Sequence, residues 1–546
     1  MDPRPPGDVD AREKGVATAS PPAARNAALR DPGWLRWLYV ATALLLLVPL
    51  WGVSRVPSLD GPSHLYNAWV MRHLHDPAYP LFGAHFELHF DPLPNWLIQV
   101  LLYLLLAVAP AAVAEKLLLS LYLLLFAATA WWFAGSVERR GAPAAFLALP
   151  FAYHHGLLLG LYNFCFAVPL ALLSVGAWWR GREDPGWRFA LRLNLLLWLC
   201  YFAHLVALAM ALLSIAVLWM ASFDRQRWKR WLLHPLLLAP QLALPLWYVL
   251  THPGDPAQGW PIAMRTASLT QLRQLWYFGD PHQLGPLLAC LFAGLVALGV
   301  LRRARRPPEH AGAADSAEIT PLRVGHWAFL AASAFALLLY FLAPGGVSQG
   351  GFLQQRMVLF PFLLALPALA RGLGHRSQVV LALSLVALVG WRTAELLRFH
   401  RELGAVVESY LETLAPVAPN SRIVPMVPGT DGMVERAVLF HAVAYVAIPK
   451  GLLNWNDGHA TVTYFPLRFR RHLRRGVTRP DGIGLAEEQY DVARYAGIVD
   501  YVHTWGLRGV SPLVPRLRRQ YRLIVTSEEG QLWRRRARWN LRPVHP

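Results

Sequence analysis

Long apolar stretches alternate with short basic turns over most of the chain. The first stretch covers residues 34–53, and stretches of similar length follow at 116–135, 157–179 and 325–343. A helix needs about 20 predominantly apolar residues to span the hydrocarbon core of a bilayer. The pattern therefore predicts an α-helical polytopic membrane protein.

The basic turns indicate on which side of the membrane each stretch begins. Lys and Arg are concentrated in the cytoplasmic loops of membrane proteins. Such clusters occur at 138–140, 180–182, 225–230 and 302–306, and six basic residues up to Arg36 place the N-terminus inside. Counting from there gives about eleven crossings, with the C-terminal residues outside. The expected crossings are 34–53, 116–135, 142–153, 157–179, two within 188–219, 232–250, 286–301, 325–343, 357–370 and 379–397.

Three stretches depart from a simple crossing. Residues 95–109 contain an apolar run of about 14 residues, short for a span, so we expect a re-entrant or interfacial element. Residues 188–219 are too long for one span and have basic turns on both sides, which predicts two short helices that meet outside near His204. Residues 63–75 are amphipathic, and we expect a helix in the membrane interface with Leu65 facing lipid.

These patterns divide the chain into three regions. Residues 1–33 are rich in Pro, Ala, Arg and Asp, which predicts a disordered cytoplasmic tail. Residues 34–400 are expected to form the transmembrane domain, with a first outer loop at 54–95. Residues 401–546 have shorter apolar runs and turn signals, which predict a small extracytoplasmic α/β domain. There we expect strands at 421–427 and 501–505, a helix at 487–496, and a hairpin that joins 521–525 to 531–533.

Composition agrees with a membrane protein and decides how the net charge is interpreted. The chain is 55% hydrophobic and only 16% charged, against about a quarter charged in an ordinary globular domain. The formal net charge is +19, but the basic residues stand largely in short turns between apolar stretches, and no nucleic-acid-binding motif accompanies them. Nucleic acid is therefore not an expected partner. Cys165, Cys200 and Cys290 all lie inside apolar stretches, where neither a disulfide framework nor a metal site is expected.

The topology collects a set of polar residues on the outer face. Ionisable groups at membrane depth are energetically expensive and are usually functional. Because these residues come from at least five separate points in the chain, their convergence on one face predicts a site at the lipid–water boundary. The candidates are Asp60, His64, Asn67, Glu87, Asp91, Asn95, His154, His155, Asn163, His204, Gln354, Gln355 and Arg356.

Asp60 is the strongest candidate for chemistry. It follows the first span by a few residues, and Gly61-Pro62 predicts a turn directly after it. A carboxylate there can accept a proton from an acceptor hydroxyl, or help to hold a divalent cation beside a phosphate. The alternative is that Asp60 only caps the helix that begins near Ser63.

The other candidates each have a structural alternative. His85 and His89 alternate with Glu87 and Asp91, which fits a metal site or an interfacial loop. Arg356, at the outer end of a span, suits a phosphate, but an interfacial Arg that extends its side chain to the membrane surface explains it as well. His204 is a phosphate contact or a buried histidine with satisfied hydrogen bonds, and Asn163 can instead bond a neighbouring helix. The chain has no P-loop, Rossmann fingerprint or nucleophile elbow.

The layout resembles the GT-C superfamily of integral membrane glycosyltransferases, in particular the RgtA/B/C/D-like and ArnT-like bacterial enzymes. The resemblance covers roughly residues 34–400. The motifs that support it are Leu59-Asp-Gly-Pro-Ser-His-Leu65, Pro94-Asn-Trp-Leu-Ile98, Tyr201-Phe-Ala-His204 and Gln354-Gln-Arg-Met-Val358. Two departures stand out: many such enzymes have a second acidic residue where this chain has Gly61, and often a Lys where it has His204.

The resemblance implies transfer of a sugar from a polyprenyl-phosphate donor to an envelope lipid, glycan or protein on the outer face of the inner (plasma) membrane. It implies Asp60 as the base and Arg356 and His204 as groups that stabilise the leaving phosphate. The cofactor is left open, with a divalent cation as one option. Two rival functions are a transporter or flippase of lipid-linked saccharides and a non-catalytic scaffold for envelope assembly. The chain shows no internal repeat of the kind common in transporters.

Overall fold

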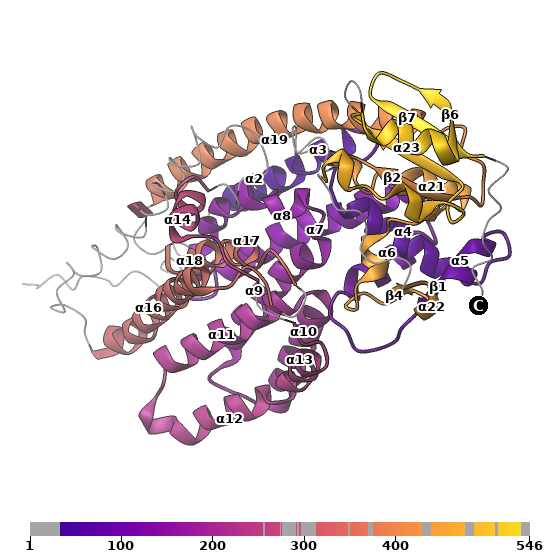
Figure 1. The fold of residues 1–546 in the computed structure, drawn as a ribbon. Coiled ribbons are helices and arrows are strands. Elements are labelled where there is room, and N and C mark those ends of the chain that lie inside the picture. Colours follow the sequence, from indigo (N-terminus) through magenta and orange to yellow (C-terminus); the bar gives the residue numbers. More distant parts are fainter. Residues whose placement is uncertain are drawn as a thin grey trace, which may run out of the picture.

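The chain folds into a helical body with a five-stranded sheet at one end (Figure 1). A computed structural model describes residues 33–254, 257–272, 275, 291, 294–295, 313–347, 350–369, 375–428, 438–474, 485–507 and 511–536. The expected tail at 1–33 and the expected crossing at 286–301 fall almost entirely outside these described residues.

Helices make up most of the described chain. The first group is α2 (Gly33–Leu45), α3 (Val48–Trp51), α4 (Gly61–Arg72), α5 (Pro80–His85), α6 (Leu97–Leu105), α7 (Ala111–Ala134), α8 (His155–Leu158), α9 (Tyr162–Gly181), α10 (Trp187–Ala203) and α11 (Leu205–Ala221). The second group is α12 (Trp228–Leu238), α13 (Pro240–Thr251), α14 (Ile262–Thr270), α16 (Ala313–Leu342), α17 (Leu353–Met357), α18 (Leu359–Leu369), α19 (His375–Glu412), α21 (Ala444–Lys450), α22 (Arg471–Arg474) and α23 (Leu513–Gln520). Short 3-10 helices are η1 (Arg139–Leu147), η2 (Leu149–Phe151), η3 (Arg225–Arg227), η4 (Gly458–Thr461), η5 (Glu487–Gln489) and η6 (Val492–Tyr495).

Within the described residues, five helical stretches are long and apolar enough to cross a membrane, by length and composition. A sixth is possible if α11 and the bent segment after it, at 107°, are one broken span. The five are Gly33–Trp51, Ala111–Ala134, Tyr162–Gly181, Val324–Leu342 and Arg376–Glu412. The count of about eleven stays a prediction, because other expected crossings are built from shorter pieces. Residues 139–151 form two 3-10 helices, and 228–251 are divided between α12 and α13.

The expected pair of short helices around His204 is present as α10 and α11. His204 itself has an extended backbone, with φ −165° and ψ 127°, and separates the two helices. Its Nδ1 accepts the N–H of Val206 at 3.2 Å and so caps α11. Since Nδ1 accepts a hydrogen bond, the ring proton of the neutral histidine is on Nε2.

Helix α4 differs from the expected interfacial helix. Leu65 was expected to face lipid, but it is fully buried, and His64 and Asn67 are buried with it. Helix α6 packs on α4, and α21 and η4 from the C-terminal part of the chain pack on it too. The expectation was wrong because a segment far away in the sequence covers this helix, and the local pattern of residues 63–75 does not indicate that segment.

The sheet is formed by the last part of the chain. Its strand order is β3-β2-β5-β7-β6, with β2 parallel to β3 and β5, and β7 antiparallel to β5 and β6. A second, two-stranded sheet pairs β1 from the first outer loop with β4 from the C-terminal region, with Glu87 opposite Arg468. The strands are β1 (Phe86–Leu88), β2 (Arg422–Met426), β3 (Leu453–Asn454), β4 (Leu467–Phe469), β5 (Tyr501–Trp505), β6 (Tyr521–Thr526) and β7 (Gly530–Arg535).

The expected strands and the terminal hairpin are confirmed as β2, β5 and the β6–β7 pair. The expected helix at 487–496 is wrong, because the segment forms two 3-10 turns, η5 and η6. The backbone is extended at Tyr490, whose side chain is buried. Asp491 then starts a new turn by accepting the N–H of Arg494. The expected domain division at residue 400 stays a prediction, and α19 runs through that position without interruption.

Candidate functional site

A cavity of about 230 Å³ lies where the helical body meets the C-terminal region. One part of its wall is apolar and comes mostly from the helical body, and another part is polar. The apolar lining includes Leu161, Phe164, Leu205, Val206, Val249, Phe352, Leu353 and Phe465. The polar lining includes Asp60, His64, Asn95, Asn163, His204, Arg356, His459 and Tyr464. The cavity therefore suits a ligand with both an apolar and a charged part.

Asp60 does not act as a helix cap. It occupies the N-cap position of α4, but its side chain makes no capping hydrogen bond there. Its Oδ1 lies 3.7 Å from Nε2 of His441, and its Oδ2 lies 3.8 Å from Nε2 of His459. The carboxylate thus faces the cavity and two imidazoles, which favours the chemical interpretation of Asp60 over the capping one.

The backbone holds Asp60 close to a second loop. The N–H groups of Leu59 and Asp60 donate to the carbonyls of Leu158 and Leu159, at 2.9 and 3.2 Å. Gly160, which follows, has a φ of +68° and lies directly against the Asp60 backbone. These contacts fix the start of α4 against the start of α9.

Burial sets the protonation of the groups around Asp60. It raises the pKa of the Asp60 carboxyl, while the charges of His441, His64 and Arg356 act against that rise. Burial also lowers the pKa of His441 to about 4 and that of His459 to about 3. The two imidazoles are therefore neutral near pH 7, beside a carboxylate with an increased proton affinity. A carboxylate in this state is suited to general-base chemistry.

His64 links Asp60 to the rest of the site. Its Nδ1 accepts the side-chain N–H of Gln99 at 3.1 Å. Its ring lies 4.5 Å from the ring of His459 and 5.6 Å from that of Phe465, centroid to centroid. Burial lowers the pKa of His64 as well. The side of the cavity next to Asp60 is therefore lined by neutral imidazole and phenyl rings that pack against one another.

Three hydrogen-bond donors line the cavity together with Asp60. Arg356 donates through one guanidinium nitrogen to the carbonyl of Gly351 at 2.7 Å, and its Nε has no hydrogen-bond partner among the described residues. His204 presents Nε2–H because its Nδ1 is used as a cap. Asn163 accepts the N–H of Ile98 at 3.2 Å, and its Nδ2 has no partner within the described chain. Such donors can stabilise a developing negative charge on a phosphate.

Six of the residues predicted from the sequence line this one cavity: Asp60, His64, Asn95, Asn163, His204 and Arg356. The other seven candidates do not line it, and three of these lie on α17 and at the start of α8. Gln355 lies beside Arg356 on α17, His154 caps α8 by accepting the N–H of Gly156, and His155 begins that helix. Their expected roles in substrate binding stay predictions.

Asn67 has a structural contact instead of a place in the lining. Its Nδ2 donates to both carboxylate oxygens of Asp457, at 2.9 and 3.1 Å. Ser63, one turn earlier on α4, donates to the same carboxylate at 2.9 Å. These bonds attach the segment around η4 to α4, and so place His459 opposite Asp60.

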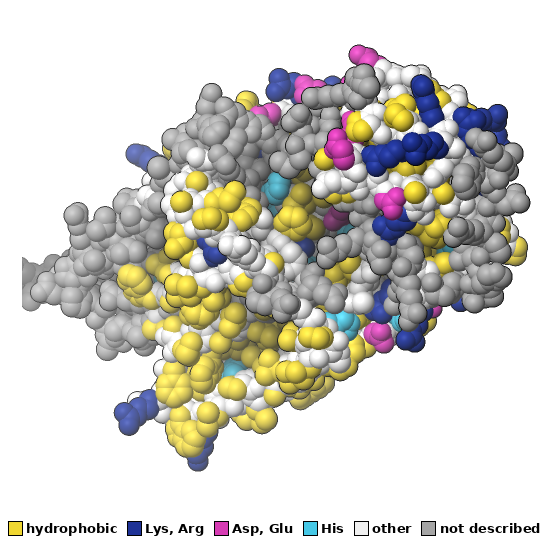
Figure 2. All heavy atoms as spheres, in the orientation of Figure 1, with side chains coloured by type: hydrophobic (Ala, Val, Ile, Leu, Met, Phe, Trp, Pro, Cys, Tyr) yellow, Lys and Arg dark blue, Asp and Glu magenta, His cyan; other side chains and the backbone are white. Residues whose placement is uncertain are grey.

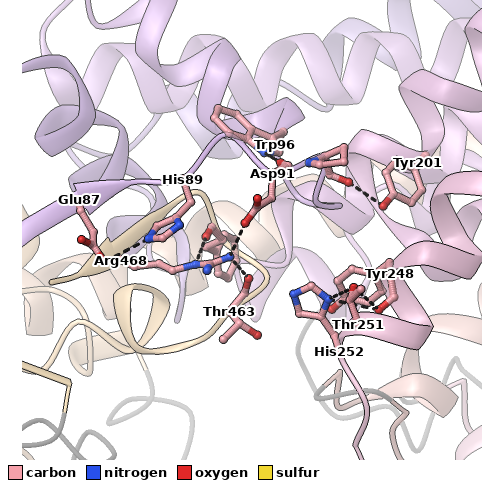
Figure 3. Close-up of polar contacts among 12 residues, drawn as sticks. Glu87, His89, Asp91, Trp96, Tyr201, Tyr248, Thr251, His252, Thr463 and Arg468 are labelled. Carbon is pink, nitrogen blue, oxygen red and sulfur yellow. Dashed lines mark hydrogen bonds and ion pairs between the residues drawn. The ribbon is translucent and has the colours of Figure 1, made fainter. Parts of the chain in front are cut away.

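Glu87 and Asp91 of the first outer loop do not line the cavity and belong to a second group of polar contacts (Figure 3). His89 contacts Glu87 at 3.1 Å, and Asp91 faces Arg468 at 3.8 Å. Nδ1 of His85 donates a hydrogen bond to the carbonyl of Leu81 at 2.8 Å. Among the described residues, no group of three His, Cys, Asp or Glu side chains is arranged to hold a metal ion. A metal role for His85 and His89 stays a prediction.

None of the site residues from the C-terminal region was predicted from the sequence. His441, His459, Tyr464 and Phe465 lie close to Asp60, although they follow it by about 380 to 400 residues in the chain. The polar run Asn454-Trp-Asn-Asp-Gly-His459 was the available signal. Nothing local in that run, however, indicates which part of the chain it packs against.

Comparisons with known proteins leave the family open. No family model matches the chain, and no curated protein matches it. Among solved structures, the chain is similar to the arabinofuranosyltransferase AftD from Mycobacteria, with a TM-score of 0.44 and 13% sequence identity. The alignment covers 93% of this chain and 40% of that protein. A likeness at this level does not assign the chain to a family.

Proposed function

We propose that this protein is a membrane glycosyltransferase that moves a sugar from a polyprenyl-phosphate donor to an envelope acceptor on the outer face of the membrane. The single observation that supports this most is the cavity, which brings together a half-buried carboxylate, hydrogen-bond donors suited to a phosphate, and an apolar wall. Asp60 is the proposed base, and Arg356 and His204 are the proposed phosphate contacts.

The lining fits the two parts of a lipid-linked donor. Leu205 and Val206 of α11 and Val249 of α13 give the cavity an apolar side. Figure 2 shows hydrophobic side chains gathered over the lobe built by α11, α12 and α13, with Lys and Arg side chains at its tip near α12. A prenyl chain can therefore extend from the cavity toward lipid, while its phosphate stays beside Arg356.

The proposed reaction is an inverting displacement. The acceptor hydroxyl oxygen attacks the anomeric carbon, and the bond from that carbon to the phosphate oxygen breaks with its electron pair on the phosphate. The proton of the hydroxyl goes to the carboxylate of Asp60. Arg356 and the Nε2–H of His204 stabilise the phosphate charge as it develops. The residues needed for this step all come from this chain.

The test is transfer by purified protein in liposomes supplied with a panel of short-chain polyprenyl-phosphate sugars. We expect release of polyprenyl phosphate with at least one donor, and a fall of about 10²- to 10⁴-fold for Asp60→Asn, the range typical of a lost general base. Asp76→Asn is the matched control, because Asp76 lies on the outer loop and its side chain bonds only the local N–H of Ala78 among the described contacts.

Two outcomes would contradict the proposal. An Asp60→Asn variant that transfers at the wild-type rate would exclude Asp60 as the base. Movement of the intact lipid-linked sugar between leaflets, without release of polyprenyl phosphate, would instead indicate the rival transporter.

A further inference from the structure

The two oxygens of Asp60 face two different imidazoles, His441 and His459, at 3.7 and 3.8 Å. His459 lines the cavity, whereas His441 is buried beside the carboxylate and does not line it. We propose that His441 is the positioning residue of the Asp60 carboxylate, and that His459 contacts the acceptor at the oxygen that receives the proton. This inference rests on the proposed function, because it assigns roles within the same site.

His441 is held in place by a contact of its own element. It stands in the turn before α21, and Tyr445 follows four residues later in that helix. The Tyr445 hydroxyl lies 2.8 Å from Oε2 of Glu115 and 3.2 Å from the carbonyl of Val56. Val56 belongs to the loop that leads into α4. The contact therefore ties α21 to the loop whose position also determines where the carboxylate stands.

Glu115 makes this attachment firm. It is fully buried at the start of α7, and it accepts hydrogen bonds from the hydroxyls of Tyr445 and Tyr162, each at 2.8 Å. The Tyr162 hydroxyl also lies 2.9 Å from the hydroxyl of Ser58. Both Glu115 carboxyl oxygens therefore have a hydrogen-bond partner in the buried interior. The segment that contains His441 is thus fixed against the spans α7 and α9.

His459 is held by a different attachment. Its backbone N–H bonds the carboxylate of Asp457, which Ser63 and Asn67 of α4 also bond. Its ring is stacked on Phe465, with centroids 4.3 Å apart. The two histidines are therefore positioned by separate contacts, and their contributions can be separated by mutation.

The geometry assigns different chemistry to the two oxygens. The proton of the acceptor hydroxyl goes to Oδ2, on the His459 side that is open to the cavity. Oδ1 faces His441, whose Nε2 can orient the carboxylate. A separation of 3.7 Å is longer than a hydrogen bond, and catalytic hydrogen bonds commonly tighten in the Michaelis complex.

The pH dependence of Asp60 reflects the titratable and charged groups that face it. These groups are His64 on α4, His441 before α21, His459 in η4, Arg356 on α17 and Tyr464. Burial raises the pKa of Asp60, and His441 opposes that rise most among its neighbours. His441 becomes protonated only as the pH falls toward its own pKa of about 4, and there its positive charge lowers the pKa of Asp60. Replacement of His441 by an uncharged residue is therefore expected to move the acidic limb of the rate profile to higher pH.

The experiment measures steady-state transfer from the polyprenyl-phosphate sugar that the wild-type protein uses, over a range of pH. For His441→Gln we expect kcat to fall by about 10- to 100-fold, as for a misplaced catalytic group, with an unchanged KM for donor and acceptor and an acidic limb at higher pH. For His459→Gln we expect a higher KM for the acceptor. His75→Gln, at an exposed position after α4, is the matched control.

The outcomes separate this inference from the proposed function. If wild-type protein transfers sugar and Asp60→Asn does not, the proposed function is supported. If, in addition, His441→Gln has a wild-type kcat and an unshifted acidic limb, only the inference about His441 is overturned. Should His441→Gln fail to fold, His441→Phe fills the buried space and tests the same limb. A fall in kcat without any shift in pH profile would indicate a purely structural role for His441 and would overturn the inference too.

Discussion

Gly160 is the residue on which the backbone of the site depends most directly. Its φ of +68° lies in the left-handed region, and a Cβ placed on it would lie 2.3 Å from the nitrogen of Gly61 and 2.6 Å from that of Asp60. Those atoms are backbone, so they cannot move aside as a flexible side chain would. The chain can approach Asp60 this closely only because residue 160 has no side chain.

Gly160→Ala is therefore expected to displace the Asp60 loop. The left-handed conformation alone costs an Ala about 1–2 kcal/mol, and the contact with the backbone adds to it. We expect a lower thermal midpoint and a loss of most transfer activity. Gly404→Ala is the control, because a Cβ there meets nothing within 4 Å on helix α19. Equal midpoints for the two variants would contradict the argument.

At the residue scale, some members of the site could be predicted from sequence and others could not. Asp60, His204 and Arg356 each stand at the end of an apolar stretch, so counting the crossings placed them on one face, and the structure brings them to one cavity. His441 and His459 do not stand at the end of a predicted membrane crossing, so the count of crossings does not place them in the site. They reach Asp60 only through tertiary contacts, such as that of Tyr445 with Glu115, and periodicity contains no information about those.

At the scale of elements, the attachment of η4 to α4 joins the two halves of the site. Asp457 is fully buried and accepts hydrogen bonds from Ser63 and Asn67 of α4. Burial raises its pKa to about 6, although these donors and the N–H groups of His459 and Ala460 act against the rise. The stability of the contact between η4 and α4 is therefore expected to depend on pH.

The sign of that sensitivity follows from the raised pKa. Because the folded protein favours protonated Asp457, its contribution to stability is complete below the unfolded pKa of about 3.9, and it is lost as pH rises through about 6. Asp457→Asn is neutral at every pH. We expect the thermal midpoint of the wild type, relative to that of the variant, to fall as pH rises from about 5 to about 7.

The difference between the thermal midpoints of the wild type and Asp457→Asn is the control in this measurement, because it removes the effect of groups that both proteins share. His441 and His459 have lowered pKa values and so stabilise the fold above about pH 6.5, losing that contribution as pH falls toward about 4 and about 3. Both proteins contain them, so their effect cancels in the difference. A difference between the midpoints that does not change with pH would show that Asp457 does not titrate in this range.

The elements also show where local pattern suffices. The break at His204 was predictable because the apolar stretch was too long for one span and had basic turns at both ends. Strands β2 and β5 and the β6–β7 hairpin were predictable from alternation and turn residues. Helix α4 was predicted, but its surroundings were not, since its burial depends on Asp457 and on segments about 400 residues away.

At the scale of the whole molecule, α19 connects the membrane body to the sheet. Its 38 residues extend for about 57 Å at 1.5 Å per residue, which exceeds the roughly 30 Å of a hydrocarbon core. Near its C-terminal end, Glu408 bonds Ser54 at 2.6 Å, and Thr413, just beyond the helix, bonds His503 of β5 at 2.6 Å. Figure 1 shows this helix running along the body to the sheet. The sheet and the loop that follows the first span therefore lie on the same side.

The expected orientation can be tested with two engineered cysteines at opposite ends of the molecule. Glu528 is exposed in the turn between β6 and β7, and Gln226 is exposed in η3, inside the basic cluster after α11. If basic turns are cytoplasmic, Glu528→Cys reacts with a membrane-impermeant maleimide in intact cells without an outer membrane, and Gln226→Cys reacts only after lysis. Cys165 and Cys200 are buried, so a background with Cys290→Ser leaves little native labelling. Labelling of Gln226→Cys in intact cells would contradict the predicted orientation. The cavity with Asp60 would then lie at the cytoplasmic face, where a donor presented outside cannot reach it.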